Sequence, residues 1–453
     1  MTNLIRTKAT KINLLDFKTP QMRAFHLTWF AFFMCFFGWF AFPALSKWVI
    51  EDLGIDKKQF VTTSQWAVGS TIIMRLFIGW LSDKIGPRKS YTYILILGSI
   101  PVFLSGFVQT YEQLLLVRVF IGGIGASFVI TQFHTSLMFA PNIVGTANAT
   151  AAGWGNLGGG VTQQVMPLLL LSFAFFMPEE MAWRYAMAVP AVIMLITGLL
   201  YSRMTTDTPN GDYATFNNNQ IANKEHGTFL DACKDYRVWI LFLLYGACFG
   251  IELIVNSNMA LYLINDIKID PYVAGTIAAL FGLMNLFART LGGVFGDRFG
   301  RSKGLNGRSQ WLFITLFFQG LFLILFSRID AILFLIPSMI IFSLFVQMAE
   351  GATFSVVPFV NKKVVGSISG IVGAGGNVGA VLGMFLFKID TLAWKDAFLV
   401  LGGIVLVLSF TALFIRFSKA ENDAANKEIA EIKKFEKTIE DTEEELEPAM
   451  ELN

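Results

Sequence analysis

Two arginines lie deep within apolar stretches of the sequence, where a permanent charge is costly. Arg75 lies eight residues before Asp83, and Arg289 lies eight residues before Asp297. Because a helix rises 1.5 Å per residue, each arginine is expected about 12 Å from its loop, near the middle of a roughly 30 Å hydrocarbon core. A charge at that depth costs at least about 2.5–3.5 kcal/mol and normally faces the interior of a helix bundle. A guanidinium offers a planar fork of donors, which suits the flat oxygen edge of a small anion.

Two acidic residues in other apolar stretches give these arginines an alternative partner. Glu252 and Glu350 could each form an ion pair with an arginine that serves the structure alone. The same acids are candidates for proton coupling, because burial opposes the ionisation of a carboxyl group whereas a nearby arginine favours it. Arg118 is a third candidate, although a structural role in the outer half of its helix would explain it equally well. We favour anion binding for Arg75 and Arg289.

Two glycine-rich stretches contain a single asparagine each. One reads Ala-Gly-Trp-Gly-Asn-Leu-Gly-Gly-Gly around Asn156, and the other reads Gly-Ala-Gly-Gly-Asn-Val-Gly around Asn377. Glycine costs about 1 kcal/mol relative to alanine inside a helix, but in lipid it lets helix backbones approach closely. Two such faces, each with one amide, predict a two-fold binding site for a small planar ligand. Gly155 and Gly376 precede the two asparagines and are expected beside that ligand.

The composition places all these residues in a membrane protein. The chain has 453 residues, 54% of them hydrophobic and 15% charged, and its mean hydropathy is +0.58. Soluble domains carry roughly 25% charged residues, so we predict an all-α polytopic membrane protein. Cys35, Cys233 and Cys248 lie too far apart for metal-ligand spacing, and we expect no metal and no cofactor.

Twelve apolar segments approach the length of about 20 residues that a membrane-spanning helix needs. They lie at 26–50, 60–82, 90–109, 112–139, 144–174, 184–203, 238–265, 272–297, 309–327, 331–359, 365–388 and 394–417. Lysine and arginine concentrate in the loops after spans two, six, eight and ten, which predicts that both termini are cytoplasmic. The expected parts are a cytoplasmic basic arm (1–25), a six-helix bundle (26–203), a cytoplasmic central loop (204–236), a second six-helix bundle (237–417) and an acidic cytoplasmic tail (418–453).

The two halves repeat one loop sequence. The loops after spans two and eight read Gly-x-x-x-Asp, then Lys or Arg, then x-Gly, and further basic residues follow. This pattern resembles the signature loop of the major facilitator superfamily, which implies a fold of six plus six helices related by a pseudo-two-fold axis. The second copy departs slightly, since Arg301 directly follows Gly300 whereas Pro87 separates Gly86 from Arg88. The resemblance implies a gating role for Gly79, Asp83, Arg88, Gly293, Asp297 and Arg301.

The glycine–asparagine stretches are similar to the paired signature motifs of the nitrate/nitrite porter family. Residues 249–253 and 350–354 add to a resemblance that covers about 26–417 and is nearest to the high-affinity assimilatory branch. It implies that Arg75 and Arg289 bind the substrate, that Tyr245 donates a hydrogen bond to the anion, and that Phe249 packs on its flat face. Tyr245 and Phe249 are four residues apart and share a helix face. Phe128 fits a similar wall position, although packing in the core would also explain it.

These features predict a secondary active transporter that moves nitrate, and probably nitrite, by alternating access. Members of the assimilatory branch are regarded as proton symporters, so proton-coupled uptake is favoured and nitrate/nitrite exchange is the alternative. A nitrate sensor on a transporter scaffold is a third option. No nucleophile–base pair, metal cluster or nucleotide loop indicates an enzyme. The expected partners are the anion, protons and lipid, with no nucleic acid, for a monomer in the bacterial inner membrane.

Overall fold

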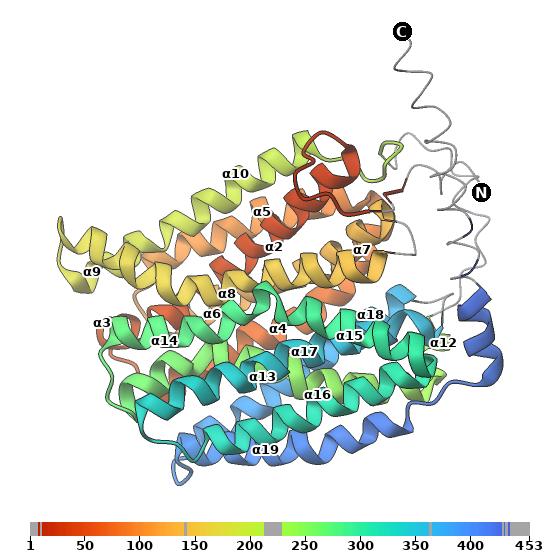
Figure 1. The fold of residues 1–453 in the computed structure, drawn as a ribbon. Coiled ribbons are helices and arrows are strands. Elements are labelled where there is room, and N and C mark those ends of the chain that lie inside the picture. The colour runs from red at the N-terminus through yellow and green to blue at the C-terminus, as the bar shows by residue number, and fades with distance from the viewer. Residues whose placement is uncertain are drawn as a thin grey trace.

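The structure, a computed structural model, describes residues 8–9, 11–139, 143–212, 229–361, 365–427, 430 and 434. Within these ranges the secondary structure is helical, apart from isolated bridges between Ala9 and Phe139 and between Thr208 and Gly211. The helices lie alongside one another in an elongated bundle (Figure 1). The predicted all-α class is therefore confirmed.

The first half of the chain forms the helices drawn from red to yellow in Figure 1. They are α2 (Pro20–Ala44), α3 (Ser46–Leu53), α4 (Lys57–Ile85), α5 (Pro87–Leu104), η1 (Ser105–Phe107), α6 (Tyr111–Gly122), η2 (Gly123–Ala126), α7 (Ser127–Met138), α8 (Val144–Ala174), α9 (Glu179–Ala186) and α10 (Ala188–Met204). Gly86 separates α4 from α5 with a φ of +86°, a left-handed conformation that side chains other than glycine rarely adopt.

The second half forms the helices drawn from green to blue. They are α12 (Phe229–Lys234), α13 (Tyr236–Asn265), α14 (Pro271–Leu283), η4 (Met284–Leu286), α15 (Ala288–Lys303), α16 (Leu305–Phe326), α17 (Ile332–Val360), α18 (Val365–Met384), η5 (Leu386–Lys388), α19 (Trp394–Ser409) and η6 (Phe410–Phe414). The halves meet where α8 packs on α14 and α15, and where α18 packs on α4.

Eleven helical segments among the described residues are long and apolar enough to cross a membrane. The remaining predicted span corresponds to α4, which has 29 residues but begins with several polar side chains. Six of the eleven segments are not continuous α-helices. Among them, the segment Tyr111–Met138 is interrupted by η2, and the segment Pro271–Gly300 is interrupted by η4, shortly before Arg289.

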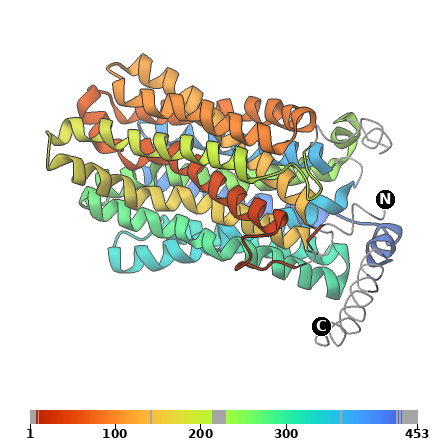
Figure 2. The ribbon, with the colours of Figure 1, turned by 90° about the horizontal axis from the view of Figure 1, so that it is seen from above.

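The bundle has two distinct ends (Figures 1 and 2). We call the end that carries the start of α2, α12 and the short helix at 419–427 the terminal end. We call the opposite end, which carries α3 and α9, the far end. Since α8, α13 and α15 begin or end at the terminal end, the position of a residue along them gives its depth.

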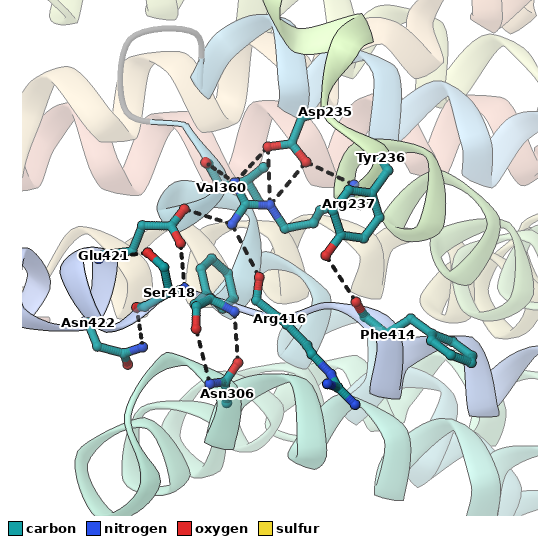
Figure 3. A network of polar contacts seen from close by, with 11 residues as sticks. Asp235, Tyr236, Arg237, Asn306, Val360, Phe414, Arg416, Ser418, Glu421 and Asn422 are labelled. Atoms are coloured by element: carbon teal, nitrogen blue, oxygen red, sulfur yellow. Dashed lines mark hydrogen bonds and ion pairs between the residues drawn. The ribbon is translucent and has the colours of Figure 1, made fainter.

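The segment after η6 is bonded to the terminal end of the second half (Figure 3). Arg237 at the start of α13 donates to Asp235 and, over 2.8 Å, to Glu421. It also donates to the carbonyl of Val360 at the end of α17. Asn306 at the start of α16 accepts from the backbone N–H of Phe417 at 2.9 Å. We call residues 415–427 the C-terminal strap, because its bonds join the start of α13 to the start of α16.

Candidate anion site

The two predicted arginines meet in the interior of the bundle. Arg75 comes from α4 of the first half and Arg289 from α15 of the second half, and each is only 1% exposed. Both guanidinium groups lie over the ring of Phe128 on α7, with their carbon atoms 5.3 Å and 5.8 Å from the ring centroid. The predicted convergence of Arg75, Arg289 and Phe128 is therefore present in the structure.

Arg289 is surrounded by partners from its own half. Its Nη1 donates to Oε2 of Glu350 on α17 and lies 4.0 Å from Oε2 of Glu252 on α13. Its Nη2 donates to the hydroxyl of Tyr245 at 2.9 Å. Both carboxyl groups are fully buried. The structure thus contains the ion pairs that we considered as the alternative to anion binding. Among the described residues, they involve Arg289 and not Arg75.

Arg75 has a different environment. Its Nη1 donates to the backbone carbonyl of Gly373 on α18, and its guanidinium lies 5.3 Å from the centroid of the Phe249 ring. Its Nε and Nη2 are buried and have no hydrogen-bond partner among the described residues. Part of the donor fork of Arg75 is therefore available to an anion.

Two asparagines connect Glu252 to its surroundings. Asn156 on α8 donates to Oε2 of Glu252 at 3.1 Å, and Asn285 in η4 donates to Oε1 at 2.7 Å. The bond from Asn156 crosses between the halves. Asn377, the repeat-related asparagine, also crosses, but it donates at 3.2 Å to the backbone carbonyl of Val68 on α4. Neither asparagine contacts an arginine through a hydrogen bond, so a direct role in substrate binding stays a prediction for both.

Aromatic rings close the site around the arginines. The rings of Tyr245 and Phe249 are stacked, with centroids 5.2 Å apart and an interplanar angle of 10°. Phe354 on α17 sets its edge against Tyr245 at 5.1 Å and against Phe128 at 5.4 Å. The rings of Phe128 and Phe249 are also stacked, with centroids 6.5 Å apart, so flat apolar faces border the two cations.

Glycines of the two motifs permit these contacts. A Cβ added at Gly153 would lie 2.7 Å from the carbonyl oxygen of Asn285, and one at Gly373 would lie 3.2 Å from Nη1 of Arg75. Gly376 faces the rings of Tyr245 and Phe249. Each motif therefore packs closely on the arginine-bearing segment of the other half.

Gly155 lies against the ring of Phe32 on α2, in its own half. Its position is related by the repeat to that of Gly376, so Phe32 occupies the place that Tyr245 and Phe249 occupy in the second half. Contact between the substrate and either glycine stays a prediction.

A small cavity of about 10 Å³ borders Arg289 on the terminal side. It is lined by Gln132, Asn148, Ala149, Ala152, Arg289, Gly351 and Phe354. At the far end the halves are joined instead, since Tyr272 donates to Glu179 at 3.1 Å and Lys58 pairs with Asp390 at 3.1 Å. The described residues therefore form a state that is closed at the far end.

The other predicted residues lie away from the arginines. Arg118 donates to Ser64 and to the carbonyl of Trp39 within the first half, which fits the structural role and leaves proton coupling through it without support. Arg88 pairs with Asp212 at 3.1 Å, after α10. Asp297 pairs with Arg308 on α16.

The glycines of the repeated loops differ in what they face. Gly293 faces Ala149 of the other half, whereas Gly79 faces Val129 of its own half. The side chains of Asp83 and Arg301 lie outside the described part of the chain. Gating by the residues of these loops stays a prediction.

Asn285 and Phe354 were not predicted as site residues. Asn285 is four residues before Arg289, and Phe354 is four residues after Glu350. Residues at this spacing share a helix face, so the signal was present. This spacing was hard to recognise in the sequence, because η4 interrupts the helix before Arg289 and because phenylalanine is abundant throughout the chain.

Comparisons with known proteins agree with this geometry. The family model of the Major Facilitator Superfamily matches residues 28–358 and 238–442. Solved structures with 14–16% identity share the fold, including a bacterial homolog of the lysosomal transporter Spinster (TM-score 0.66, 89% of this chain and 99% of that chain) and the nucleoside transporter NupG (TM-score 0.61, 87% and 100%). This chain therefore belongs to the major facilitator superfamily and is an integral membrane transporter, not an enzyme.

Sequence relatives indicate which family within the superfamily the chain resembles. The chain is 34% identical over 426 residues to the high affinity nitrate transporter 2.7 of Arabidopsis thaliana (90% of this chain, 86% of the relative). It is 37% identical over 423 residues to the nitrate transporter 2.2 of Chlamydomonas reinhardtii (90% and 82%). It is 28% identical over 496 residues to the nitrate/nitrite transporter NrtP of Picosynechococcus (88% and 92%). Within the superfamily, the chain is a member of the nitrate/nitrite porter family. A bacterial inner membrane stays a prediction, since these relatives include plant and algal proteins.

Proposed function

We propose that this protein is a secondary transporter that carries nitrate, and also nitrite, by alternating access, and that uptake is coupled to protons. The observation that carries the proposal is that Nε and Nη2 of Arg75 have no partner among the described residues, beside the rings of Phe128 and Phe249. A buried guanidinium without a counter-charge is stabilised by an anion. The names of the relatives identify nitrate as the anion to test first.

Charge balance supports proton coupling. Two arginines and two glutamates are buried together, so their charges cancel when all four are ionised. Nitrate adds one negative charge to this cluster. Binding therefore becomes more favourable when Glu252 or Glu350 takes up a proton and frees donors of Arg289. One proton per nitrate keeps the cluster neutral throughout the cycle, whereas two would move net charge.

We further propose that the terminal end faces the cytoplasm and that α4 is a twelfth span. Lysine and arginine dominate the terminal-end loops, while Glu51, Asp52, Glu179 and Glu180 lie at the far end. Arg75 on α4 faces the interior of the bundle, where an intramembrane charge is tolerated. Because the two halves of one chain each contribute an arginine to the site, we propose a functional monomer made of two six-helix bundles.

The test is uptake of labelled nitrate into liposomes that contain the purified protein. An inward proton gradient should drive accumulation when the lumen holds no nitrate or nitrite. Uptake that appears only after preloading with nitrite or nitrate would instead establish exchange.

Two variants make this test specific. Glu252→Gln and Glu350→Gln each remove one titratable group and keep its approximate size, so proton-driven uptake should be lost. Labelled nitrate should still exchange with internal nitrate. If proton-driven accumulation persists in both variants, Glu252 and Glu350 are not the proton-coupling site.

A further inference from the structure

The seam between α8 and α13 contains a row of amide side chains that begins at Glu252 and leads away from the arginines. Asn256 lies one turn beyond Glu252 on α13, and Gln163 lies two turns beyond Asn156 on α8. At 1.5 Å per residue these steps are about 6 Å and about 10 Å toward the far end. Asn156 itself donates to Glu252 across the seam. The row is therefore continuous in depth from the carboxyl group outward.

Contacts place Asn256 and Gln163 together in this seam. Nε2 of Gln163 donates to the backbone carbonyl of Asn256 at 2.9 Å. A Cβ added at Gly159 would lie 3.2 Å from Nδ2 of Asn256, so the absence of a side chain there leaves space for this amide. Both residues are buried, with exposed fractions of 3% and 1%. Two elements from different halves thus present polar groups to each other inside the bundle.

These amides have unused hydrogen-bonding capacity. Among the described residues, neither Nδ2 nor Oδ1 of Asn256 has a partner, and the same holds for Oε1 of Gln163 and Oδ1 of Asn156. A buried polar group without a partner costs about 1–3 kcal/mol. Groups of this kind in protein interiors are normally satisfied by water, which makes about three hydrogen bonds at such sites.

We propose that Asn256 and Gln163 hold water molecules in a relay that carries protons between Glu252 and the far side. Each water passes on one proton as it receives another, so the amides stay neutral while the Glu252 carboxylate becomes a carboxylic acid. Asn256 and Gln163 lie toward the far end from Glu252, whereas the cavity at Arg289 is lined by residues toward the terminal end of α8, such as Asn148 and Ala149. This inference rests on the proton coupling proposed above.

Among the described residues, the charged groups that face Glu252 from the neighbouring helices belong to the anion site. Arg289 on α15 and Glu350 on α17 are charged, α4 brings Arg75 nearby, and α8 and η4 supply only the amides of Asn156 and Asn285. A proton that arrives through the relay therefore meets Glu252 before it meets the arginine-bound Glu350.

The experiment compares two modes of transport in the full-length protein in liposomes. Asn256→Leu and Gln163→Leu should each lower proton-driven nitrate accumulation about ten-fold, the effect of losing one hydrogen-bonding station worth about 1.4 kcal/mol. Exchange of labelled nitrate against internal nitrate should stay within about two-fold of the wild type, since that mode moves no proton. Asn256→Ser should retain accumulation, because a hydroxyl group can also hold water.

Thr162→Val is the matched control. Thr162 is buried next to Gln163, but its hydroxyl donates to the carbonyl groups of Gly158 at 2.5 Å and of Phe37 on α2 at 3.3 Å, both within the first half. Both transport modes should be unchanged in this variant. Normal accumulation in Asn256→Leu and Gln163→Leu would overturn the relay, and so would equal loss of accumulation and exchange. If the wild type itself shows no proton-driven uptake, the proposed coupling fails and the relay fails with it.

Discussion

Arg75 and Arg289 occupy related positions in the two halves, yet their surroundings differ in charge. Each lies eight residues before a loop aspartate, and each is 1% exposed. Arg289 pairs with Glu350 and lies 4.0 Å from Glu252, whereas Arg75 has a backbone carbonyl and aromatic rings. The repeat thus supplies two equivalent cations, and among the described residues only Arg289 has carboxyl groups beside it.

The difference extends to the neighbouring positions. The two arginines are 214 residues apart, and the same offset relates Asn285 to Thr71. Asn285 donates to Glu252, but Thr71 donates to the carbonyl groups of Ala67 and Gly122. In physical terms, the guanidinium of the first half keeps donors without a partner among the described residues, and that of the second half is set against carboxyl groups. The comparison makes four predictions.

The largest effect is expected when either arginine is replaced by alanine. Arg289→Ala leaves two carboxyl groups buried together without a cation, and breaking a buried pair in this way costs about 3–5 kcal/mol. Arg75→Ala leaves no such group, so its stability should change far less, although both variants should lose nitrate transport. The free energy of unfolding in detergent is the measurement. Equal destabilisation by the two variants would contradict the comparison, and Glu350→Gln should partly restore Arg289→Ala.

Replacement by lysine tests the donor fork instead of the charge. Lysine keeps the positive charge but cannot offer a planar pair of donors. A hydrogen bond to a charged group contributes about 1.5–3 kcal/mol, so Arg75→Lys and Arg289→Lys should each weaken nitrate transport by about ten-fold or more. Initial rates of labelled nitrate uptake as a function of concentration provide the readout. Near-normal affinity in either variant would show that its fork does not bind the anion.

Gly153 and Gly373, one from each motif, should differ in how well they tolerate replacement by alanine. Alanine at Gly153 would push against the backbone oxygen of Asn285 at 2.7 Å, and overpacking of this kind costs about 1–3 kcal/mol. Alanine at Gly373 would meet the end of the flexible Arg75 side chain at 3.2 Å, which can shift by a few tenths of an ångström. We expect Gly153→Ala to lower the thermal midpoint more than Gly373→Ala. The reverse order would mean that the first motif is the looser one.

The smallest difference in stability is expected between variants of the two motif asparagines, Asn156 and Asn377. Asn156 donates to a carboxyl group and Asn377 to a backbone carbonyl. Bonds to charged groups contribute about 1.5–3 kcal/mol and neutral bonds about 0.5–1.5 kcal/mol. Asn156→Ala should therefore destabilise the protein more than Asn377→Ala, and only the former should shift the pH dependence of uptake. A shift of the same size in both variants would remove the distinction.

The sequence predicted the depth of the arginines and the pairing of the motifs better than it predicted their partners. Helical rise and the repeat offset need only spacing, so Arg75, Arg289, Asn156 and Asn377 could be placed without coordinates. Which arginine receives Glu252 depends on how α13 packs against α15. That packing in turn depends on the break at η4, for which spacing along a continuous helix carries no signal.

The C-terminal strap offers a way to observe the motion of the carrier. Its bonds reach Arg237 and Asn306, which both belong to the second half. A spectroscopic label on the exposed Ala424 would therefore travel with that half, and a label on Met204 at the end of α10 would travel with the first. The distance between the two labels should take one value in the state described here and another when the far end opens, so it would report how nitrate and protons shift the balance between these states.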